Sequence, residues 1–163
     1  MMSEPSAPVA IVTGAGSGIG RAIAVAPAKE GHAVAIFERD VAIFERDEAS
    51  GAQPAETIRA AGGHAVAFTV DVTIRAQVDA AVAGAITRLG RVDVLVNNAG
   101  VGWLGSVVDL SEAEWDHVMA VNVKSVHLCS TSQYRNPLGD LMALDRGTHV
   151  LHKDTLVMAP VAA

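Results

Sequence analysis

The stretch "VAIVTGAGSGIG", residues 9–20, decides the fold of this 163-residue chain. It begins with a short β-branched run that ends in a glycine turn, which is typical of a buried strand. Glycines follow at positions 14, 18 and 20, and a helix is predicted over residues 18–30. A strand that turns through glycines into a helix indicates the start of a βαβ unit.

The three glycines stand where a dinucleotide fingerprint requires them. Gly14 permits the tight turn, Gly18 lets the backbone approach a pyrophosphate, and Gly20 allows the helix to pack closely on the sheet. The N-terminus of the helix offers free N–H groups and a favourable dipole to phosphates. The alternative interpretation is an ordinary strand-to-helix turn without a ligand.

Strands continue to alternate with helices after this unit. Further strands are predicted at "GHAVAIF" (31–37), "HAVAFTV" (64–70) and "VDVLVNN" (92–98), with helices near 56–61 and 77–89. This spacing predicts an α/β fold with a parallel sheet and right-handed crossovers. Residues 1–8 are expected to be disordered and 9–130 to form the domain. Residues 131–163 form a divergent tail, in which "THVLH" could add a fifth strand.

Two helices carry local signals. Ser111 with Glu114 predicts a capping box at the start of a fourth helix. Pro27 falls inside the first helix and costs about 3 kcal/mol there, so that helix is expected to be kinked or to lose its last turn. The residues expected on the apolar face of the fourth helix are Trp115, Val118, Met119, Val121 and Val126.

Composition excludes several classes of function. The formal net charge of −6 provides no basic field for nucleic acid or an anionic membrane surface. The start, "MMSEPSAP", resembles neither a signal peptide nor an anchor. Cys129 is the only cysteine, and the one close histidine pair, His149 and His152, is too few ligands for zinc, so no metal site is expected. A reduced, cytoplasmic protein is predicted.

Four motifs in order give the chain a family resemblance. "TGAGSGIG" (13–20) and "NNAG" (97–100), together with "DVT" (71–73) and "VNVKS" (121–125), resemble the short-chain dehydrogenase/reductase family over residues 9–130. The resemblance implies a Rossmann-like, doubly wound sheet of about four strands in the order 3-2-1-4. It also implies that Asn122 supports a proton relay. The implied cofactor-binding residues are Gly14, Ser17, Gly18, Ile19, Gly20, Glu38, Asp71, Val72, Asn98, Ala99 and Gly100.

Some of these residues have other interpretations. Taken singly, Asn98 and Gly100 could simply end a strand, Asp71 could cap the following helix, and Asn122 could be a satisfied polar group in a helix. In this order and spacing the cofactor interpretation is favoured. A flavin would also need a glycine turn and an acidic residue, but "NNAG" and "DVT" favour a nicotinamide cofactor.

The cofactor is predicted to be NAD, with NADP left open. Glu38 lies eighteen residues after Gly20, close to the separation expected of a carboxylate that binds the ribose hydroxyls and repels a 2′-phosphate. Ser17 is uncharged where NADP-preferring family members often carry a basic residue. Arg39 could still pair with a phosphate.

The catalytic residues that the resemblance implies are incomplete. Family members use a tyrosine, a lysine four residues later and a serine. The only tyrosine is Tyr134, and Leu138 stands four residues on. Two hypotheses follow: an NAD(P)-dependent oxidoreductase acting on an alcohol or ketone, truncated and impaired, or a non-catalytic dinucleotide-binding fragment or interaction module. Strand 92–98 is expected to be an exposed edge, which predicts a homo-oligomer or aggregation.

The heptapeptide "VAIFERD" occurs twice in tandem, at 34–40 and 41–47. The first copy is predicted to be the strand, because it follows a short link and brings Glu38 to the cofactor distance. The second copy is predicted to be an insertion, either a loop over the adenosine site or extra turns of the next helix. Lengthening a loop in this way costs little closure entropy.

Overall fold

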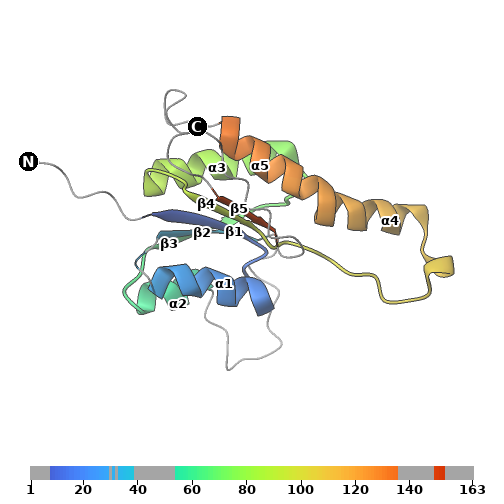
Figure 1. Cartoon of the computed structure of the whole chain (residues 1–163), viewed down its shortest axis with the longest axis horizontal. Coiled ribbons are helices and arrows are strands. Elements are labelled where there is room, and N and C mark those ends of the chain that lie inside the picture. Colours follow the sequence, from blue (N-terminus) through green and yellow to red (C-terminus); the bar gives the residue numbers. More distant parts are fainter. Residues whose placement is uncertain (1–7, 30, 32, 39–53, 136–148, 153–163) are drawn as a thin grey trace, which may run out of the picture.

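A parallel sheet forms the centre of the computed structural model, which describes residues 8–29, 31, 33–38, 54–135 and 149–152. For residues 38, 134–135 and 149–152 it describes the backbone alone. The sheet order is β3-β2-β1-β4-β5 (Figure 1). The strands are β1 (Val9–Thr13), β2 (Ala33–Glu38), β3 (Ala65–Thr69), β4 (Val94–Asn97) and β5 (His149–His152).

The predicted order 3-2-1-4 is confirmed, and a fifth strand extends it. β5 runs parallel to β4, with partners from Val94 and His149 to Asn97 and His152. The expectation that strand four is an exposed edge is therefore wrong, because β4 has a neighbour on each side. β5 lies within "THVLH" (148–152), which the sequence allowed as a fifth strand, and its pairing with β4 confirms that possibility.

The first copy of the heptapeptide forms β2, as predicted. Val34 pairs with Ala10 and Phe37 with Thr13, and both Val34 and Phe37 are fully buried. The second copy, residues 41–47, lies outside the described residues. Because the first copy forms β2, the backbone of Glu38 lies at the end of this inner strand of the sheet.

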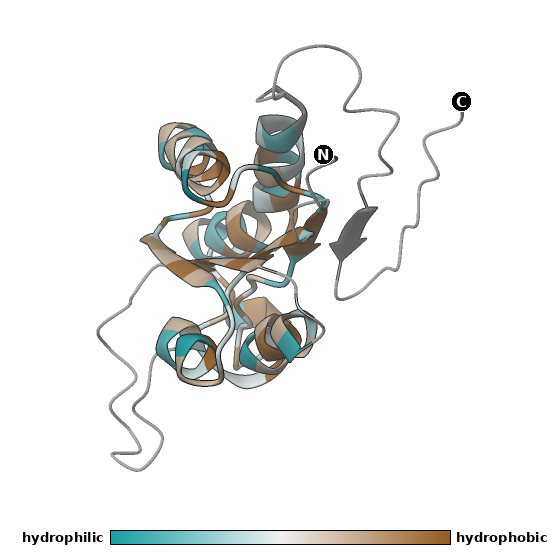
Figure 2. Ribbon diagram, turned by 90° about the vertical axis from the view of Figure 1, so that its left-hand side faces the viewer, coloured by the Kyte–Doolittle hydropathy of each residue, from teal (hydrophilic) through white to brown (hydrophobic). Residues whose placement is uncertain are grey.

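Two helix layers cover the sheet (Figure 1). α1 (Gly18–Lys29) and α2 (Pro54–Ala60) lie on one face, and α3 (Arg75–Leu89) and α5 (Ser125–Arg135) on the other. Neighbouring residues of β1 therefore pack on opposite faces of the sheet. Val12 packs in the cluster with Ala24 of α1 and Ile58 of α2, whereas Ile11 packs with Val82 of α3. Figure 2 shows the hydrophobic strands between the two layers. Burial on both faces explains why the strands are continuous apolar runs.

The predicted fourth helix is divided in the structure. α4 (Glu112–Met119) ends in a π-helical turn (Ala120–Lys124), and α5 follows. The capping box is confirmed, since the Ser111 hydroxyl accepts from the Glu114 N–H and the Glu114 carboxylate accepts from the Ser111 N–H.

The apolar face predicted for this helix is exposed at two of its residues. Trp115 is 53% and Met119 37% exposed, and α4 has no buried residue. α4 extends past the sheet in Figure 1, so its side chains have no sheet to pack on. The residues of the helical segment that are buried come after α4, and they are Val121, Ser125, Leu128, Cys129 and Ser132.

Pro27 does not end α1. The helix continues to Lys29, and the Gly31 N–H then donates to the Ala28 carbonyl at 3.2 Å. The expectation that the last turn is lost is wrong. Proline removes its own N–H from the ladder and its ring crowds the carbonyl four residues earlier, but α1 packs on the sheet through Ala24 and Ala28 and its last turn persists.

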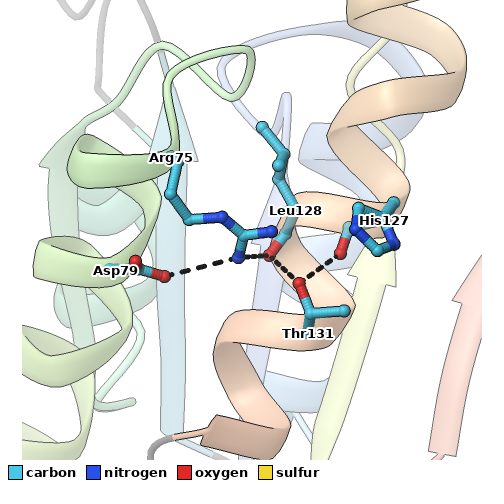
Figure 3. Close-up of polar contacts among 5 residues, drawn as sticks. All are labelled: Arg75, Asp79, His127, Leu128 and Thr131. Carbon is cyan, nitrogen blue, oxygen red and sulfur yellow. Dashed lines mark hydrogen bonds and ion pairs between the residues drawn. The ribbon is translucent and has the colours of Figure 1, made fainter.

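Arg75 joins the two helices of one layer (Figure 3). Its Nη1 donates to the Leu128 carbonyl at 3.0 Å and lies 3.6 Å from Oδ1 of Asp79. The Thr131 hydroxyl donates to the His127 carbonyl at 2.7 Å and to the Leu128 carbonyl at 3.3 Å. The Arg75 bond to Leu128 therefore joins α3 to α5, whereas the two Thr131 bonds lie within α5.

Candidate functional site

The candidate site lies where the central strands β1 and β4 end side by side. All strands are parallel, so their carboxyl ends share one edge of the sheet. β1 continues into α1 on one face, whereas β4 leads to the helices on the other face (Figure 1). The chain reverses its direction of winding between these two strands. Such a switch point leaves a crevice in which open α/β sheets bind ligands.

Asn98 binds the glycine turn to the end of β4. Its side-chain Nδ2 donates to the carbonyls of Thr13 and Gly14 at 3.0 and 2.9 Å. Both hydrogens of the amide are thus used within the protein. The Gly14 N–H donates to the Phe37 carbonyl at 2.8 Å, which ties the same turn to β2. Asn98 therefore shapes the crevice by holding the two turns together.

Thr13 completes this connection from the other side. Its hydroxyl accepts the backbone N–H groups of Asn98 and Ala99, each at 3.0 Å, and donates to the Val96 carbonyl at 3.4 Å. The side chain is 2% exposed. The sequence places Thr13 at the end of a strand and at the start of the "TGAGSGIG" motif, but it does not predict the bonds of its hydroxyl to the end of β4. The signal that could have identified this role is a hydroxyl at the end of an otherwise apolar strand.

The glycines at 14 and 20 are required by close contacts. Gly14 has a φ of +64°, and a Cβ there would lie 2.7 Å from the Cα of Ala99. A Cβ on Gly20 would lie 2.1 Å from the Gly14 carbonyl oxygen and 2.3 Å from Nδ2 of Asn98. The sequence predicts that Gly20 allows helix-to-sheet packing, but its closest contacts are with the turn and Asn98.

Gly18 has a different environment. Its φ is +52°, and a Cβ built there meets no heavy atom within 4 Å among the described residues. The Ser17 carbonyl accepts from the Arg21 N–H at 3.1 Å, so the helix begins at this point. In any α-helix the first four backbone N–H groups have no carbonyl acceptor within the helix. Open space beside free N–H groups and a positive dipole fits a phosphate.

The first residues of α1 also face outward. Ser17 is exposed, and Ile19 is 71% exposed at the same helix end. Gly100 is exposed beyond the end of β4, whereas Ala99 is half-buried. These four residues, predicted to contact a cofactor, therefore border the crevice from both strands.

The ends of β2 and β3 form the other side of the edge. The backbone of Glu38 pairs with Thr69 at the last position of β2. The Asp71 carboxylate accepts from the Thr73 N–H at 2.9 Å and from the Thr73 hydroxyl at 2.6 Å. Asp71 thus closes its own turn, and the N-cap residue of α3 is Ile74, whose side chain makes no capping bond. Val72 is 8% exposed within this turn.

Asn122 binds a single residue of the loop after β4. Its Oδ1 accepts from the Val101 N–H, and its Nδ2 donates to the Val101 carbonyl, both at 2.8 Å. Asn122 lies in the π-helical turn, where the Ser125 hydroxyl donates to the Val121 carbonyl at 2.5 Å. π-helical turns are frequent at functional sites. Here the turn presents Asn122 to the loop that leaves the crevice.

Asn122 is the only catalytic residue that the sequence predicts, and the described residues bring no tyrosine and lysine pair to this edge of the sheet. Tyr134 lies in the last turn of α5, twelve residues after Asn122, which is about 18 Å along a helix. Leu138 lies outside the described residues. Cys129 is buried, and burial raises the pKa of its thiol to about 12, with Arg75 partly opposing the rise. Cys129 is therefore a protonated core residue.

The described part of the chain contains neither a candidate metal site nor a candidate membrane-spanning helix. No group of three or more histidine, cysteine, aspartate or glutamate side chains in it could hold a metal ion. None of its helices combines the length and apolar character needed to cross a bilayer.

Comparisons with known proteins agree with the geometry. A family model described as short chain dehydrogenase matches residues 8–140. The chain is 42% identical over 121 residues to the short-chain dehydrogenase/reductase eriH of Hericium erinaceus, covering 74% of this chain and 47% of that protein. It is 38% identical over 142 residues to 2-(S)-hydroxypropyl-CoM dehydrogenase 3 of Xanthobacter autotrophicus, covering 87% and 51%. The chain spans about half the length of the curated relatives it matches.

Solved structures give the same result. A short-chain dehydrogenase/reductase from Burkholderia phymatum in complex with NAD matches with a TM-score of 0.77 and 32% identity, covering 93% of this chain and 50% of that one. A metagenomic short-chain oxidoreductase in complex with NADP matches with a TM-score of 0.75 and 36% identity, covering 90% and 61%.

Proposed function

This chain belongs to the short-chain dehydrogenase/reductase family, and from that premise we propose that it binds NAD across the carboxyl edge of its sheet. The observation that carries the proposal is the Asn98 amide holding the turn at Gly14. This contact keeps the N-terminus of α1 at the switch point, where the open space at Gly18 fits a pyrophosphate.

The proposed cofactor-binding residues divide between the two halves of the dinucleotide. Glu38, Asp71 and Val72 border the adenosine half at the ends of β2 and β3. Ser17, Gly18, Ile19 and Gly20, with Gly14, form the phosphate turn. Asn98, Ala99 and Gly100 border the second half at the end of β4. We propose residues 9–130 as the binding unit, to which residues 131–163 add the end of α5 and the edge strand β5.

The preference for NAD rests on Glu38. A carboxylate after strand two accepts hydrogen bonds from both ribose hydroxyls and repels a 2′-phosphate. NADP stays open, because Arg39 follows Glu38 in the sequence and a relative binds NADP. Another relative is complexed with NAD, so the comparisons support the nicotinamide class and leave the choice to measurement.

The proposed reaction class is hydride transfer between the nicotinamide and an alcohol or ketone, with low or no activity in this chain. A tyrosine with a pKa near 10 needs a neighbouring cation to exchange protons at neutral pH. The sequence has Leu138 four residues after Tyr134. Asn122, which supports the proton relay in family members, has its amide bound to Val101 here, so its proposed part is to position the loop.

A second candidate function is a non-catalytic interaction module. α4 has no buried residue, and Trp115 and Met119 are exposed on it. A helix of eight residues gains little stability by itself, which favours a covering partner such as a second copy. Sedimentation velocity tests this candidate, since a monomer at all concentrations contradicts the homo-oligomer.

We propose a cytoplasmic location, because a chain with a single cysteine cannot form an internal disulfide of the kind found in oxidising compartments.

Calorimetric titration of the purified chain with NADH, NADPH and FAD tests the binding proposal. NADH is expected to bind one per chain and more tightly than NADPH, because of Glu38. Tighter NADPH binding contradicts the NAD preference, and binding of neither nicotinamide cofactor contradicts the proposed function. A yellow purified protein that binds FAD would favour the flavin alternative.

Activity is tested separately from binding. NADH oxidation is followed at 340 nm with a panel of ketones, and no turnover above background is expected. Measurable turnover would show that the chain is an active oxidoreductase despite the missing tyrosine and lysine pair.

A further inference from the structure

The turn between β3 and α3 carries two of the proposed cofactor-binding residues, Asp71 and Val72. The Asp71 carbonyl accepts from the Ile74 N–H at 3.0 Å, and its carboxylate accepts from the N–H and the hydroxyl of Thr73. These bonds join residues that are close neighbours in the chain. They therefore set the shape of the turn and leave its position beside α3 to other contacts.

Gln77 makes a hydrogen bond that joins this turn to the body of α3. Its side-chain Oε1 accepts from the Asp71 N–H at 2.7 Å, across six positions of the chain. Gln77 lies in the first turn of α3 and is exposed. Val78, the next residue, is fully buried and packs in one cluster with Val72 of the turn. The turn is thus attached to α3 by a polar bond at Asp71 and by apolar packing at Val72.

The Gln77 bond differs from the one that a helix start usually makes. Gln77 is the third residue of α3, and at this position a Gln or Glu side chain usually accepts from the backbone N–H of the N-cap residue. The N-cap residue of α3 is Ile74, whose N–H donates to the Asp71 carbonyl and whose side chain makes no capping bond. The Gln77 oxygen therefore stabilises the turn that precedes the helix and does not close a capping box.

We propose that Gln77 is a positioning residue for the adenine half of the cofactor. It acts through the turn: by holding the Asp71 N–H it keeps Asp71 and Val72 at the carboxyl edge of β3. This inference rests on the proposed function, in which Asp71 and Val72 border the adenosine half. Without the Gln77 bond the turn occupies its binding position for only part of the time, and the apparent dissociation constant rises in proportion.

Three variants of the full chain isolate the contribution of the Gln77 oxygen. Gln77→Met removes the oxygen and keeps a side chain of similar length and helix propensity. Gln77→Glu keeps an oxygen acceptor at the same position and is the rescue variant. Thr87→Val is the matched control, because the Thr87 hydroxyl is also exposed and donates to the Ala83 carbonyl at 2.8 Å. The control removes a side-chain bond of the same helix, near its other end.

Amide hydrogen exchange tests the bond itself, without a ligand. In Gln77→Met the Asp71 amide is expected to exchange about threefold faster or more than in the unaltered chain, because its acceptor has been removed. The Gly90 N–H, which donates to the Ile86 carbonyl at the other end of α3, should exchange at the same rate in both proteins. Equal exchange of the Asp71 amide in both would overturn the inference, since Gln77 would then hold nothing in place.

Calorimetry with separate halves of the cofactor tests the positioning role. The probes are NADH, AMP for the adenosine half and reduced nicotinamide mononucleotide for the other half. Gln77→Met is expected to weaken the binding of NADH and of AMP by about fivefold each and to leave the affinity for the nicotinamide mononucleotide unchanged. Gln77→Glu and Thr87→Val should bind all three probes like the unaltered chain. A residue that only stabilises the helix would lower the urea midpoint without separating the two halves of the cofactor.

Several results would overturn the inference while the proposed function stands, provided that NADH binds the unaltered chain. Unchanged AMP affinity in Gln77→Met, or equal weakening of AMP and the nicotinamide mononucleotide, would show that Gln77 does not position the adenine half. The same loss in Thr87→Val would assign the effect to α3 as a whole, and the same loss in Gln77→Glu would show that the oxygen is not its cause.

Two further results concern the unaltered chain. If it binds NADH but not AMP, the adenine half contributes no recognition that Gln77 could support, and the inference is overturned. If it does not bind NADH, the proposed function is contradicted and the inference falls with it.

Discussion

Asn98 donates a 2.9 Å hydrogen bond from its side-chain amide to the carbonyl oxygen of Gly14, although eighty-four positions separate the two residues. This bond joins the turn after β1 to the end of β4. It also brings Nδ2 so near to α1 that only glycine fits at position 20. One side chain therefore determines the spacing of the crevice between the two central strands.

Replacing Asn98 by leucine is expected to destabilise the chain by about 2–4 kcal/mol, because the Thr13 and Gly14 carbonyls lose their donor. Asn97→Leu is the matched control, since Asn97 is also buried but its Nδ2 has no hydrogen-bond partner among the described residues. Its cost should stay below about 1.5 kcal/mol. Urea unfolding measures both, and equal costs would show that the Asn98 bonds contribute nothing specific.

The two variants Gly20→Ala and Gly18→Ala are expected to fail in different ways. At Gly20 a Cβ lies 2.1 Å from the Gly14 oxygen, so the turn must move, at a cost of about 3 kcal/mol or more. At Gly18 the space is open, and the left-handed φ costs only about 1–2 kcal/mol. The Gly18 variant should nevertheless lose NADH affinity, because its methyl group stands where the phosphates approach. Thermal unfolding and calorimetry separate the two effects, and unchanged affinity in Gly18→Ala would place the phosphates elsewhere.

Glu38→Gln is expected to weaken NADH binding by about tenfold and to narrow the preference over NADPH, since hydrogen bonds to a charged acceptor contribute about 1.5–3 kcal/mol. The duplication supplies a matched control in Glu45→Gln, because Glu45 holds the same position in the second heptapeptide. That variant should bind both cofactors like the unaltered chain. If Glu45→Gln has the larger effect, the second copy supplies the ribose-binding carboxylate.

The capping box predicts an acid-sensitive helix. Hydrogen bonds from the Ser111 hydroxyl and backbone N–H hold the pKa of Glu114 below its ordinary value of 4.5. A carboxyl with a lowered pKa in the folded state stabilises that state above its unfolded pKa, and the contribution is lost as pH falls below about 4.5. The stability difference between the unaltered chain and Glu114→Gln should therefore shrink from pH 6 to pH 3.5 in urea unfolding. A difference that is constant with pH would contradict the assignment.

Cys129 is expected to resist alkylation in the folded chain. Its side chain is 1% exposed, and burial raises the pKa of the thiol to about 12. The thiolate is the reactive form, so iodoacetamide at pH 7.5 should react at least about a hundredfold more slowly than in urea. A thiol with a raised pKa stabilises the fold below the unfolded pKa, and this contribution is lost as pH rises above about 9. Rapid alkylation of the folded protein would show that α5 opens readily from the sheet.

Local sequence signals predicted most of the elements but not all of their environments. The capping box at Ser111 and Glu114 and the choice of the first heptapeptide for β2 depend on neighbours within a few positions, and both are confirmed. The helical spacing of Trp115 and Met119 predicted that they belong to the apolar face of a helix. The spacing does not show that α4 extends beyond the sheet, where both side chains are exposed.

By itself, the sequence determined the alternation of strands and helices, the place of the glycine turn and the family to which the chain belongs, because these depend on periodicity and short motifs. Only the tertiary structure decided that Thr13 and Asn98 join β1 to β4, that Asn122 holds Val101, and that β5 covers the edge of β4. The reason is that hydrogen bonds between residues distant in the chain depend on which strand ends meet, and no local pattern specifies that meeting.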